Sequence, residues 1–198
     1  MNQIDQFLTQ DSILKTLIEA IDLNPLSPTH TPFTSLSRSI ISQQLSIKAA
    51  QSILKRCEDF FGTEFEPPKI LNTPQEELRS LGISGRKASY WQNIAIHSQQ
   101  NPQFWKDIAT YPDQKIIDEL TQIKGVGVWT VHMLLMFNLL REDIFPIGDL
   151  AIRDAMCRLY QIDASKKEHY QKLEQIAKKW SPYRSVASRY LWSWRGMQ

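Results

Sequence analysis

A carboxylate and a glycine-bearing turn are the two features of the sequence best suited to chemistry. Asp149 directly precedes an amphipathic stretch, where a carboxylate can cap a helix and is stabilised as an anion. Gly127 lies twenty-two residues earlier, in Lys124-Gly125-Val126-Gly127, between two apolar periodic segments. Glycines permit positive φ and close approach of another molecule, and a helix begins with unsatisfied backbone amides. The segment predicts either an ordinary turn between helices or a site that binds phosphate without reading bases.

Helices are expected to position these residues, because apolar residues recur at helical spacing and no sustained strand-like alternation is present. Ser46 is expected to cap one helix, and 73–76 to form a capping box whose helix stops at Gly82. Further helices are predicted at about residues 12–21, 86–99, 113–122, 128–140, 149–161, 165–179 and 183–195. The expected fold class is all-α with two lobes, one of about residues 45–140 and one of residues 1–44 plus 141–198.

The composition excludes a disordered chain and gives no global signal for a polyanionic partner. Of 198 residues 42% are hydrophobic, and the net charge is only +2. The charge is unevenly distributed, with −3 over the first 30 residues and +6 from Lys166 to the end. One end of the chain is therefore expected to be able to face a polyanion.

Two cysteines, Cys57 and Cys157, lie one hundred residues apart without any CxxC pair. This spacing argues against a disulfide framework, a zinc site and an iron–sulfur cluster. The most apolar run, 128–140, is shorter than the ~20 residues of a membrane span, and the N-terminus lacks a signal-peptide pattern. The sequence favours a soluble intracellular protein with free thiols.

Several separate motifs, in a matching order along the chain, resemble the helix-hairpin-helix DNA glycosylases. The specific resemblance is to the alkylbase, or 3-methyladenine DNA glycosylase II, family in its short form. It is carried by Ser39–Ala50, Leu81–Ala88, the hairpin Leu120–Val131, Phe145–Arg153 and Trp180–Trp192. The resemblance implies the two-lobed all-α fold of that superfamily. It also implies hydrolysis of the N-glycosidic bond of alkylated purines, such as 3-methyladenine and 7-methylguanine, in base excision repair.

For catalysis, the resemblance implies that Asp149 stabilises an oxocarbenium-like sugar and activates water. Purines alkylated at N3 or N7 already carry positive charge and leave without a proton donor, which suits a site with one carboxylate. In relatives that also cut the DNA backbone, a lysine stands two residues after the second hairpin glycine. Trp129 occupies that position here. Hydrolysis without a lyase step is therefore expected.

For binding, the resemblance places Trp129 and Trp192 in the pocket that receives the extruded base, with Met133 where a larger relative has tyrosine. Gln44 or Leu45 is expected to fill the gap that the extruded nucleotide leaves. The residues expected to contact DNA are Gln43, Gln44, Leu45, Ser84, Gly85, Lys87, Lys124, Gly125, Val126, Gly127 and Thr130.

The resemblance also implies a structural Na⁺ or K⁺ held by the backbone carbonyls of Thr121, Ile123 and Val126. No other cofactor is expected. None of the four histidines has metal-ligand spacing, and none is assigned to catalysis. The expected partner is double-stranded DNA that contains damaged bases, with no membrane partner and a monomeric protein. The expected location is the bacterial cytoplasm at the nucleoid, or the nucleus of a eukaryote.

Other interpretations of the same residues stay open at this point. Asp149 can serve only as a helix cap, each tryptophan can belong to the core, and 44–45 can be a plain loop between helices. At the level of function, the alternatives are a non-catalytic DNA-binding module with the same hairpin, or a glycosylase for oxidised or deaminated bases. The absence of a hairpin lysine and of cluster cysteines argues against the oxidised-base branch.

Overall fold

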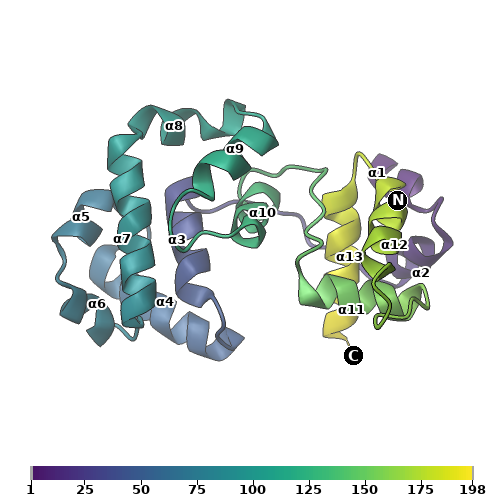
Figure 1. Ribbon diagram of the computed structural model, residues 1–198, viewed down its shortest axis with the longest axis horizontal. Coiled ribbons are helices and arrows are strands. Elements are labelled where there is room, and N and C mark those ends of the chain that lie inside the picture. Colours follow the sequence, from purple (N-terminus) through teal and green to yellow (C-terminus); the bar gives the residue numbers. More distant parts are fainter. Residues whose placement is uncertain (1, 198) are drawn as a thin grey trace. The chain divides into compact units, whose positions relative to one another are not determined.

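The computed structural model describes residues 2–197, and within that range every regular element is a helix (Figure 1). The all-α prediction is therefore confirmed. The chain divides into two compact units, and each is described by itself. The central unit is Ser27–Leu139, and the terminal unit joins the residues up to Leu26 with those from Leu140 onward. The central unit begins at Ser27 rather than near residue 45, because the helix over Pro32–Ser42 packs on helices of that unit.

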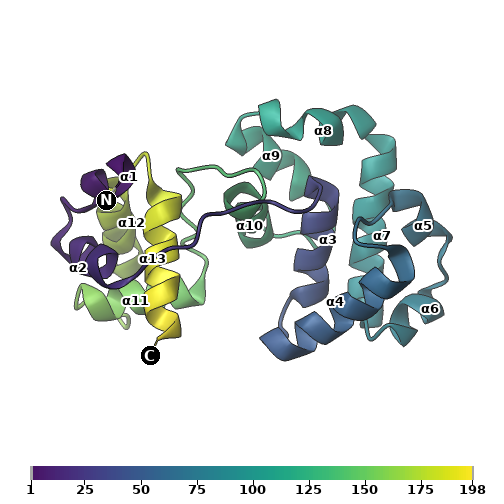
Figure 2. The same ribbon diagram turned by 180° about the vertical axis from the view of Figure 1, so that it is seen from behind.

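Helix α7 is the main support of the central unit. It contacts α3, α5, α6 and α8 and is visible beside α3 in both ribbon views (Figure 2). Its Trp91 is completely buried and meets the rings of Phe61 and Phe65 edge-on at centroid distances of 5.2 and 5.1 Å. The helices of this unit are α3 (Pro32–Ser42), α4 (Ile47–Phe61), α5 (Pro67–Asn72), α6 (Gln75–Ser80), α7 (Gly85–Gln100), α8 (Pro102–Asp107), the 3₁₀ turn η1 (Ile108–Thr110), α9 (Asp113–Leu120) and α10 (Val128–Phe137).

The terminal unit joins the two ends of the chain around one apolar core. Asp11 caps α2, and its other oxygen accepts hydrogen bonds from Tyr160 (2.8 Å) and the indole of Trp180 (3.0 Å). A charge-assisted network of this kind ties the first helices to the last ones. The helices are α1 (Gln3–Leu8), α2 (Ser12–Ala20), α11 (Leu150–Leu159), α12 (His169–Lys178) and α13 (Arg184–Gly196).

Two of the predicted helix signals are confirmed. The Ser46 hydroxyl accepts the amide of Ala49 at 3.3 Å, so Ser46 is the N-cap of α4. Gly82 follows the end of α6 with a φ of +95°, the left-handed conformation expected of a glycine stop. No helix among residues 2–197 is both long and apolar enough to cross a lipid bilayer.

Two of the predicted helix starts are wrong. The Thr73 hydroxyl donates to the carbonyl of Lys69 at 2.7 Å and so completes α5, while α6 begins at Gln75 without a side-chain cap. Helix α12 begins at His169 rather than near 165, because the Asp163 carboxylate accepts the amide of Ser165 at 3.0 Å and folds this stretch into a turn. In both places a local side-chain hydrogen bond competes with the helix.

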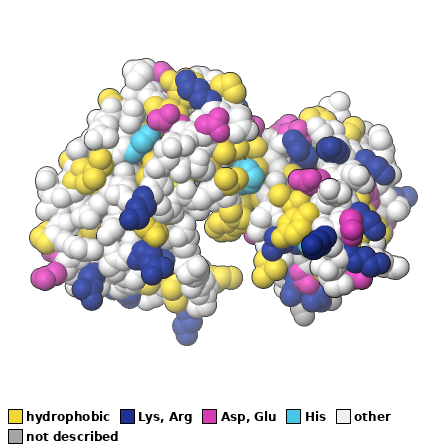
Figure 3. Space-filling model, viewed as in Figure 1, with side chains coloured by type: hydrophobic (Ala, Val, Ile, Leu, Met, Phe, Trp, Pro, Cys, Tyr) yellow, Lys and Arg dark blue, Asp and Glu magenta, His cyan; other side chains and the backbone are white. Residues whose placement is uncertain are grey.

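The basic C-terminal segment does not form a uniformly positive face. In the view of Figure 3, Lys and Arg side chains spread over the terminal unit with Asp and Glu side chains among them. Arg184 forms a two-pronged pair with Asp143, at 2.7 and 2.9 Å. Burial acts to raise the pKa of Asp143, but the hydrogen bonds from Arg184 and Ser181 outweigh it and lower the pKa.

Candidate functional site

The glycine-bearing segment forms a hairpin between α9 and α10 in the central unit. The turn is closed by the Ile123 amide on the Leu120 carbonyl (3.1 Å) and the Val126 amide on the Ile123 carbonyl (2.9 Å). Gly127 is the N-cap of α10, which therefore starts without a side-chain cap. A helix start of this kind favours an anion, because the amides of its first turn carry partial positive charge.

Helix α7 lies against the hairpin and explains its first glycine. Gly125 has a φ of +106°, and a Cβ there would lie 2.2 Å from Cγ of Tyr90. Asn93 of the same helix donates its side-chain amide to the Lys124 carbonyl at 3.1 Å, while the Lys124 side chain is exposed. Gly127 differs, because its φ is −98° and a Cβ there would meet nothing within 4 Å. The first glycine is thus needed by the fold, and the second leaves open space on the surface.

The loop between α3 and α4 is the second segment predicted to contact DNA. Gln44 adopts a φ of +57° and is exposed, and Leu45 is an apolar side chain with 37% exposure. The Gln43 side chain donates to the hydroxyl of Thr130 at 3.2 Å, which ties the loop to α10. Thr130 itself is only 2% exposed. Its side chain therefore links α10 to the loop, and a contact of Thr130 with DNA stays a prediction.

Lys87 of α7 also binds the loop between α3 and α4, through backbone carbonyls at its start. Its ammonium donates to the carbonyls of Ile41 (2.8 Å) and Gln43 (2.5 Å), at the C-terminal end of α3, and burial lowers its pKa. A cation is well placed there, because the last carbonyls of a helix carry partial negative charge. The sequence predicts that Lys87 contacts DNA, whereas the structure uses its charge within the protein. Ser84 caps α7 and is exposed, with Gly85 beside it.

A pocket of about 730 Å³ lies in the central unit between this loop and α10. It is lined on one side by Trp129, whose side chain is 40% exposed, and by the half-buried Met133 one turn later. Gln44 and Leu45 line it on the loop side. The structure therefore brings two residues predicted to bind the base and two predicted to fill the gap to one cavity.

Asp149 and Trp192 are brought together in the terminal unit. Asp149 is the N-cap of α11, and its Oδ1 accepts the Ile152 amide and the Trp192 indole N–H, each at 3.0 Å. Both side chains are half-buried, and α11 packs on α13, which carries Trp192. The helix-cap interpretation of Asp149 is confirmed, and its catalytic role stays a prediction.

The comparisons with known proteins agree with this arrangement. The model of the HhH-GPD superfamily base excision DNA repair proteins matches residues 37–182. The DNA-3-methyladenine glycosylase 1 of Schizosaccharomyces pombe is 35% identical over 81% of this chain and 71% of its own length. The chain belongs to the HhH-GPD superfamily, within its 3-methyladenine DNA glycosylase family.

Other members of the family extend the match in sequence and in structure. YfjP of Bacillus subtilis is 30% identical over 90% of this chain, which spans 64% of the length of YfjP. The S. pombe 3-methyladenine DNA glycosylase Mag1, in a complex with abasic DNA, has a TM-score of 0.85 and 29% identity, covering 97% of this chain and 96% of Mag1. A DNA-3-methyladenine glycosidase from Bacillus halodurans has a TM-score of 0.84 and 33% identity, covering 99% and 90%.

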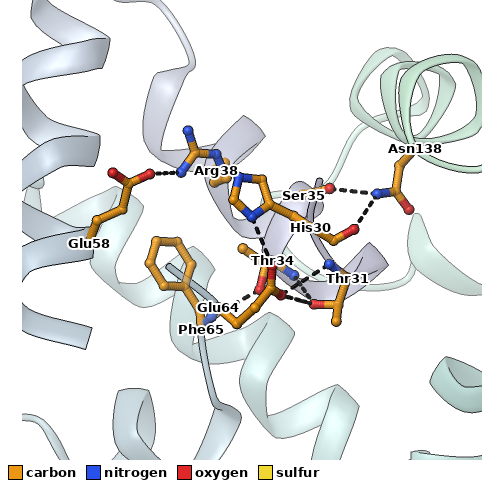
Figure 4. Close-up of polar contacts among 9 residues, drawn as sticks. All are labelled: His30, Thr31, Thr34, Ser35, Arg38, Glu58, Glu64, Phe65 and Asn138. Atoms are coloured by element: carbon orange, nitrogen blue, oxygen red, sulfur yellow. Dashed lines mark hydrogen bonds and ion pairs between the residues drawn. The ribbon is translucent and has the colours of Figure 1, made fainter. Parts of the chain in front are cut away.

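This glycosylase-family chain also carries a polar pocket wall that sequence patterns did not reveal (Figure 4). His30 Nδ1 lies 2.8 Å from Oε1 of Glu64, and Arg38 pairs with Glu58. Asn138 donates to the His30 carbonyl and to the Ser35 hydroxyl, both at 2.8 Å. These partners are up to 108 residues apart, so no local motif could indicate them.

Hydrogen bonds rather than burial decide the charge of Glu64 in this wall. Burial acts to raise its pKa, but the hydroxyl and amide of Thr31 and the ring of His30 lower it to about 2. Glu64 is therefore a fixed anion behind His30 over the physiological pH range.

The described part of the chain holds no cluster of His, Cys, Asp or Glu side chains for a metal ion, and burial raises the pKa of both cysteine thiols. No group of three or more His, Cys, Asp or Glu residues among 2–197 could hold a metal ion. Cys57 is buried, and this burial raises the pKa of its thiol to about 12. A thiol with that pKa stays protonated and is a poor nucleophile.

The two hairpin glycines give a matched pair of substitutions. We expect Gly125→Ala to destabilise the protein by about 1–3 kcal/mol, because the new methyl group clashes with Tyr90 at a positive φ. Gly127→Ala should cost less, about 0.5–1 kcal/mol, because its Cβ enters open space at a negative φ and only the N-cap preference for glycine over alanine is lost. Chemical denaturation measures both values. Equal stability of the two variants would contradict the assignment of the first glycine.

Lys87→Met removes the two hydrogen bonds under the loop. We expect the free energy of unfolding to fall by about 1–3 kcal/mol, the range for hydrogen bonds to a charged group. Amide hydrogen exchange of residues 43–45 should become faster, because the carbonyls that Lys87 binds lie at the start of this loop. Lys48→Met, at an exposed lysine of α4, is the control and should change neither quantity. Unchanged exchange in Lys87→Met would show that the loop is held by other contacts.

Proposed function

We propose that this protein is a monofunctional DNA glycosylase. It hydrolyses the N-glycosidic bond of alkylated purines, of the 3-methyladenine and 7-methylguanine type, in double-stranded DNA during base excision repair. The observation that carries the proposal is the carboxylate of Asp149, fixed by the Ile152 amide and the Trp192 indole. The names of its relatives support the substrate class, and the abasic DNA in the Mag1 complex supports DNA as the partner.

In this proposal the central unit binds the damaged duplex. The amides of the hairpin at Gly125 and Gly127, with Lys124, receive one phosphate segment, and Ser84 and Gly85 receive a second. The amide of Val126 is bonded to the Ile123 carbonyl within the hairpin, so it is not available to a phosphate. Val126 therefore contributes to DNA binding by shaping the turn that presents the neighbouring glycines. Contacts of this kind fix the register of the protein on DNA without reading sequence.

Base extrusion costs a few kcal/mol, and contacts of the protein with the duplex and with the extruded base offset this cost. Gln44 or Leu45 fills the gap in the duplex, with Gln43 holding the loop. Stacking on an aromatic ring is worth ~1–3 kcal/mol per base, and a cationic base gains more over an indole. In the central unit, Trp129 and Met133 supply a surface for the base, and Trp192 is the base-binding residue proposed for the terminal unit. An alkylated purine is thereby favoured by its positive charge.

Asp149 supplies the chemistry. The C1′–N bond breaks with its electron pair going to the base, so a cationic alkylpurine leaves as a neutral molecule. The carboxylate stabilises the oxocarbenium-like sugar that remains. A water oxygen then bonds to C1′, and its proton passes to Asp149. The indole N–H of Trp192 keeps the carboxylate oriented throughout.

The proposal also includes a monovalent cation at the hairpin. Its ligands would be the carbonyls of Thr121, Ile123 and Val126. The Ile123 carbonyl accepts the Val126 amide and keeps a second lone pair for an ion. Bound there, Na⁺ or K⁺ would add positive charge to a phosphate-binding turn. The proposal includes no other cofactor, and it places the monomeric protein wherever cellular DNA is repaired.

Asp149→Asn tests the catalytic role directly. Asparagine caps a helix about as well as aspartate, so stability should be nearly unchanged, while the loss of charge should reduce base release by about 10²- to 10⁴-fold. Release of methylated bases from alkylated duplex DNA is measured by chromatography, and duplex binding by fluorescence anisotropy. Asp163→Asn is the control, because that carboxylate also accepts a nearby amide but is exposed. Equal release by wild type and Asp149→Asn would remove Asp149 from its role.

The proposal that the enzyme hydrolyses the glycosidic bond without a lyase step can be tested separately. Trp129 stands at the hairpin position where a nucleophilic amine would be needed. We expect no covalent enzyme–DNA adduct when the reaction is treated with borohydride, and DNA strands that break only after alkali. A bifunctional glycosylase run in parallel provides the positive control. A trapped adduct would show that an amine of this protein attacks C1′.

A further inference from the structure

The loop of residues 43–45 lies between two pockets of the central unit. On one side is the pocket of about 730 Å³, which Trp129 also lines. On the other side is a smaller pocket of about 220 Å³, whose lining includes Ser84 and Lys87. All three loop residues line both pockets. The loop is therefore a thin partition, and its position decides how much space is left beside Trp129.

Gln43 is held from both sides of this partition. Its backbone carbonyl accepts the Lys87 ammonium of α7, and its side-chain amide donates to the Thr130 hydroxyl of α10 at 3.2 Å. The next residue, Gln44, has a φ of +57°, which costs free energy in a residue with a side chain. Such a conformation persists only where surrounding contacts determine it. The two tethers at Gln43 are contacts of that kind.

Thr130 joins the loop to the other segments that are predicted to bind DNA. Its amide donates to the Gly127 carbonyl at 2.9 Å and closes the first turn of α10 directly after the hairpin. Thr130 is 2% exposed, so its hydroxyl would be costly to leave without the partner that Gln43 provides. Trp129 is the adjacent residue of the same turn. A displacement of the loop is therefore transmitted to the turn that carries Trp129.

We propose that Gln43 and Thr130 are positioning residues that couple two steps of base extrusion, an inference that rests on the proposed glycosylase function. In the first step Gln44 or Leu45 fills the gap in the duplex, and in the second the extruded base stacks on Trp129. The Gln43–Thr130 hydrogen bond fixes the distance between these groups. A loop seated in the duplex thereby sets the wall that receives the base. Precise placement matters, because a displacement of ~1 Å can slow a reaction by about 100-fold.

A double-mutant cycle across this hydrogen bond tests the coupling. Thr130→Val removes the hydroxyl and keeps the shape of the side chain, and Gln43→Leu removes the donor. The measured quantity is the single-turnover rate of base release from duplex DNA treated with dimethyl sulfate, at saturating enzyme. We expect each variant to be about 3- to 10-fold slower, the range for one hydrogen bond between uncharged groups. The double variant should be no slower than the slower single variant, because both substitutions remove the same bond.

Thr130→Ser keeps the hydroxyl and should release bases at nearly the wild-type rate. The affinity of Thr130→Val for an undamaged duplex, measured by fluorescence anisotropy, should be close to that of the wild type, because the contact that is lost lies within the protein. A loss of release without a loss of duplex affinity separates positioning from general DNA binding.

A second readout follows gap filling without any chemistry. The probe is a duplex with 2-aminopurine opposite a tetrahydrofuran abasic analogue, whose fluorescence changes when a side chain enters the gap. At saturating protein this change should be smaller for Thr130→Val than for the wild type. Thr73→Val is the matched control, because the buried Thr73 hydroxyl donates to the Lys69 carbonyl at 2.7 Å and Thr73 lines neither pocket. This control should lower stability and alter neither base release nor fluorescence.

Wild-type release and fluorescence in a folded Thr130→Val protein would overturn the proposal, as would single effects that add in the double variant. If Thr130→Val fails to fold, Gln43→Leu, at a half-buried position, decides by the same two measurements. Absence of base release by the wild type would instead refute the proposed glycosylase function. The fluorescence of the abasic duplex would then still show whether the Gln43–Thr130 contact positions the loop.

Discussion

The central unit depends on α7 as a common support for its two predicted DNA-contacting segments. The ring of Tyr90 occupies the space where a side chain at position 125 would lie. Asn93 donates its side-chain amide to the carbonyl of Lys124, the residue before Gly125. Lys87, one turn before Tyr90, binds the carbonyls at the base of the 43–45 loop. Because one helix fixes both segments, their separation is set by rigid backbone geometry. Preorganised segments lose less entropy on binding a duplex than mobile ones do.

In the proposed mechanism, Asp149 serves both the fold and the chemistry. A helix start stabilises an anion, so the position that caps α11 also keeps a carboxylate ionised. The Trp192 indole adds a second donor to the same oxygen, which fixes the direction of the carboxylate. A nucleophile or general base gains from such fixing, because no reorganisation is then needed when charge develops on the sugar. The structural and catalytic interpretations of this residue therefore do not compete.

Sequence patterns predict the local parts of this structure well. Helical periodicity, the Ser46 cap, the Gly82 stop and the helix start at Asp149 all depend on residues within four positions of each other. The errors at Thr73 and Asp163 arise where a side chain can bond to more than one nearby backbone group, and packing decides between them. The family resemblance locates the hairpin and the carboxylate, but it says nothing of which side chains hold them.

The contacts that sequence could not predict join residues far apart in the chain. From the sequence, Lys87 is a lysine at a helix start and is expected on the surface. In the structure, α7 packs on α3, and this packing brings the Lys87 ammonium to the carbonyls at the end of α3. His30 lies between prolines in an irregular segment, and its anchor is 34 residues away. Such pairs produce no periodic pattern in the sequence, because the two partners can lie at any distance from each other along the chain. Contacts of this kind are therefore harder to predict than the hairpin and the position of the carboxylate.

Under the proposed function, the carboxylate and the lining of the central-unit pocket bear differently on how undamaged purines are spared. A carboxylate near C1′ stabilises the same sugar cation whichever base departs, so Asp149 alone cannot distinguish lesions from normal bases. A cationic alkylpurine leaves unaided, whereas a neutral purine needs a proton on its ring to leave at a useful rate. Among the described residues that line the pocket, none is a carboxylic acid that could donate this proton. Selectivity against normal DNA then follows from withholding an acid rather than from excluding the base by shape.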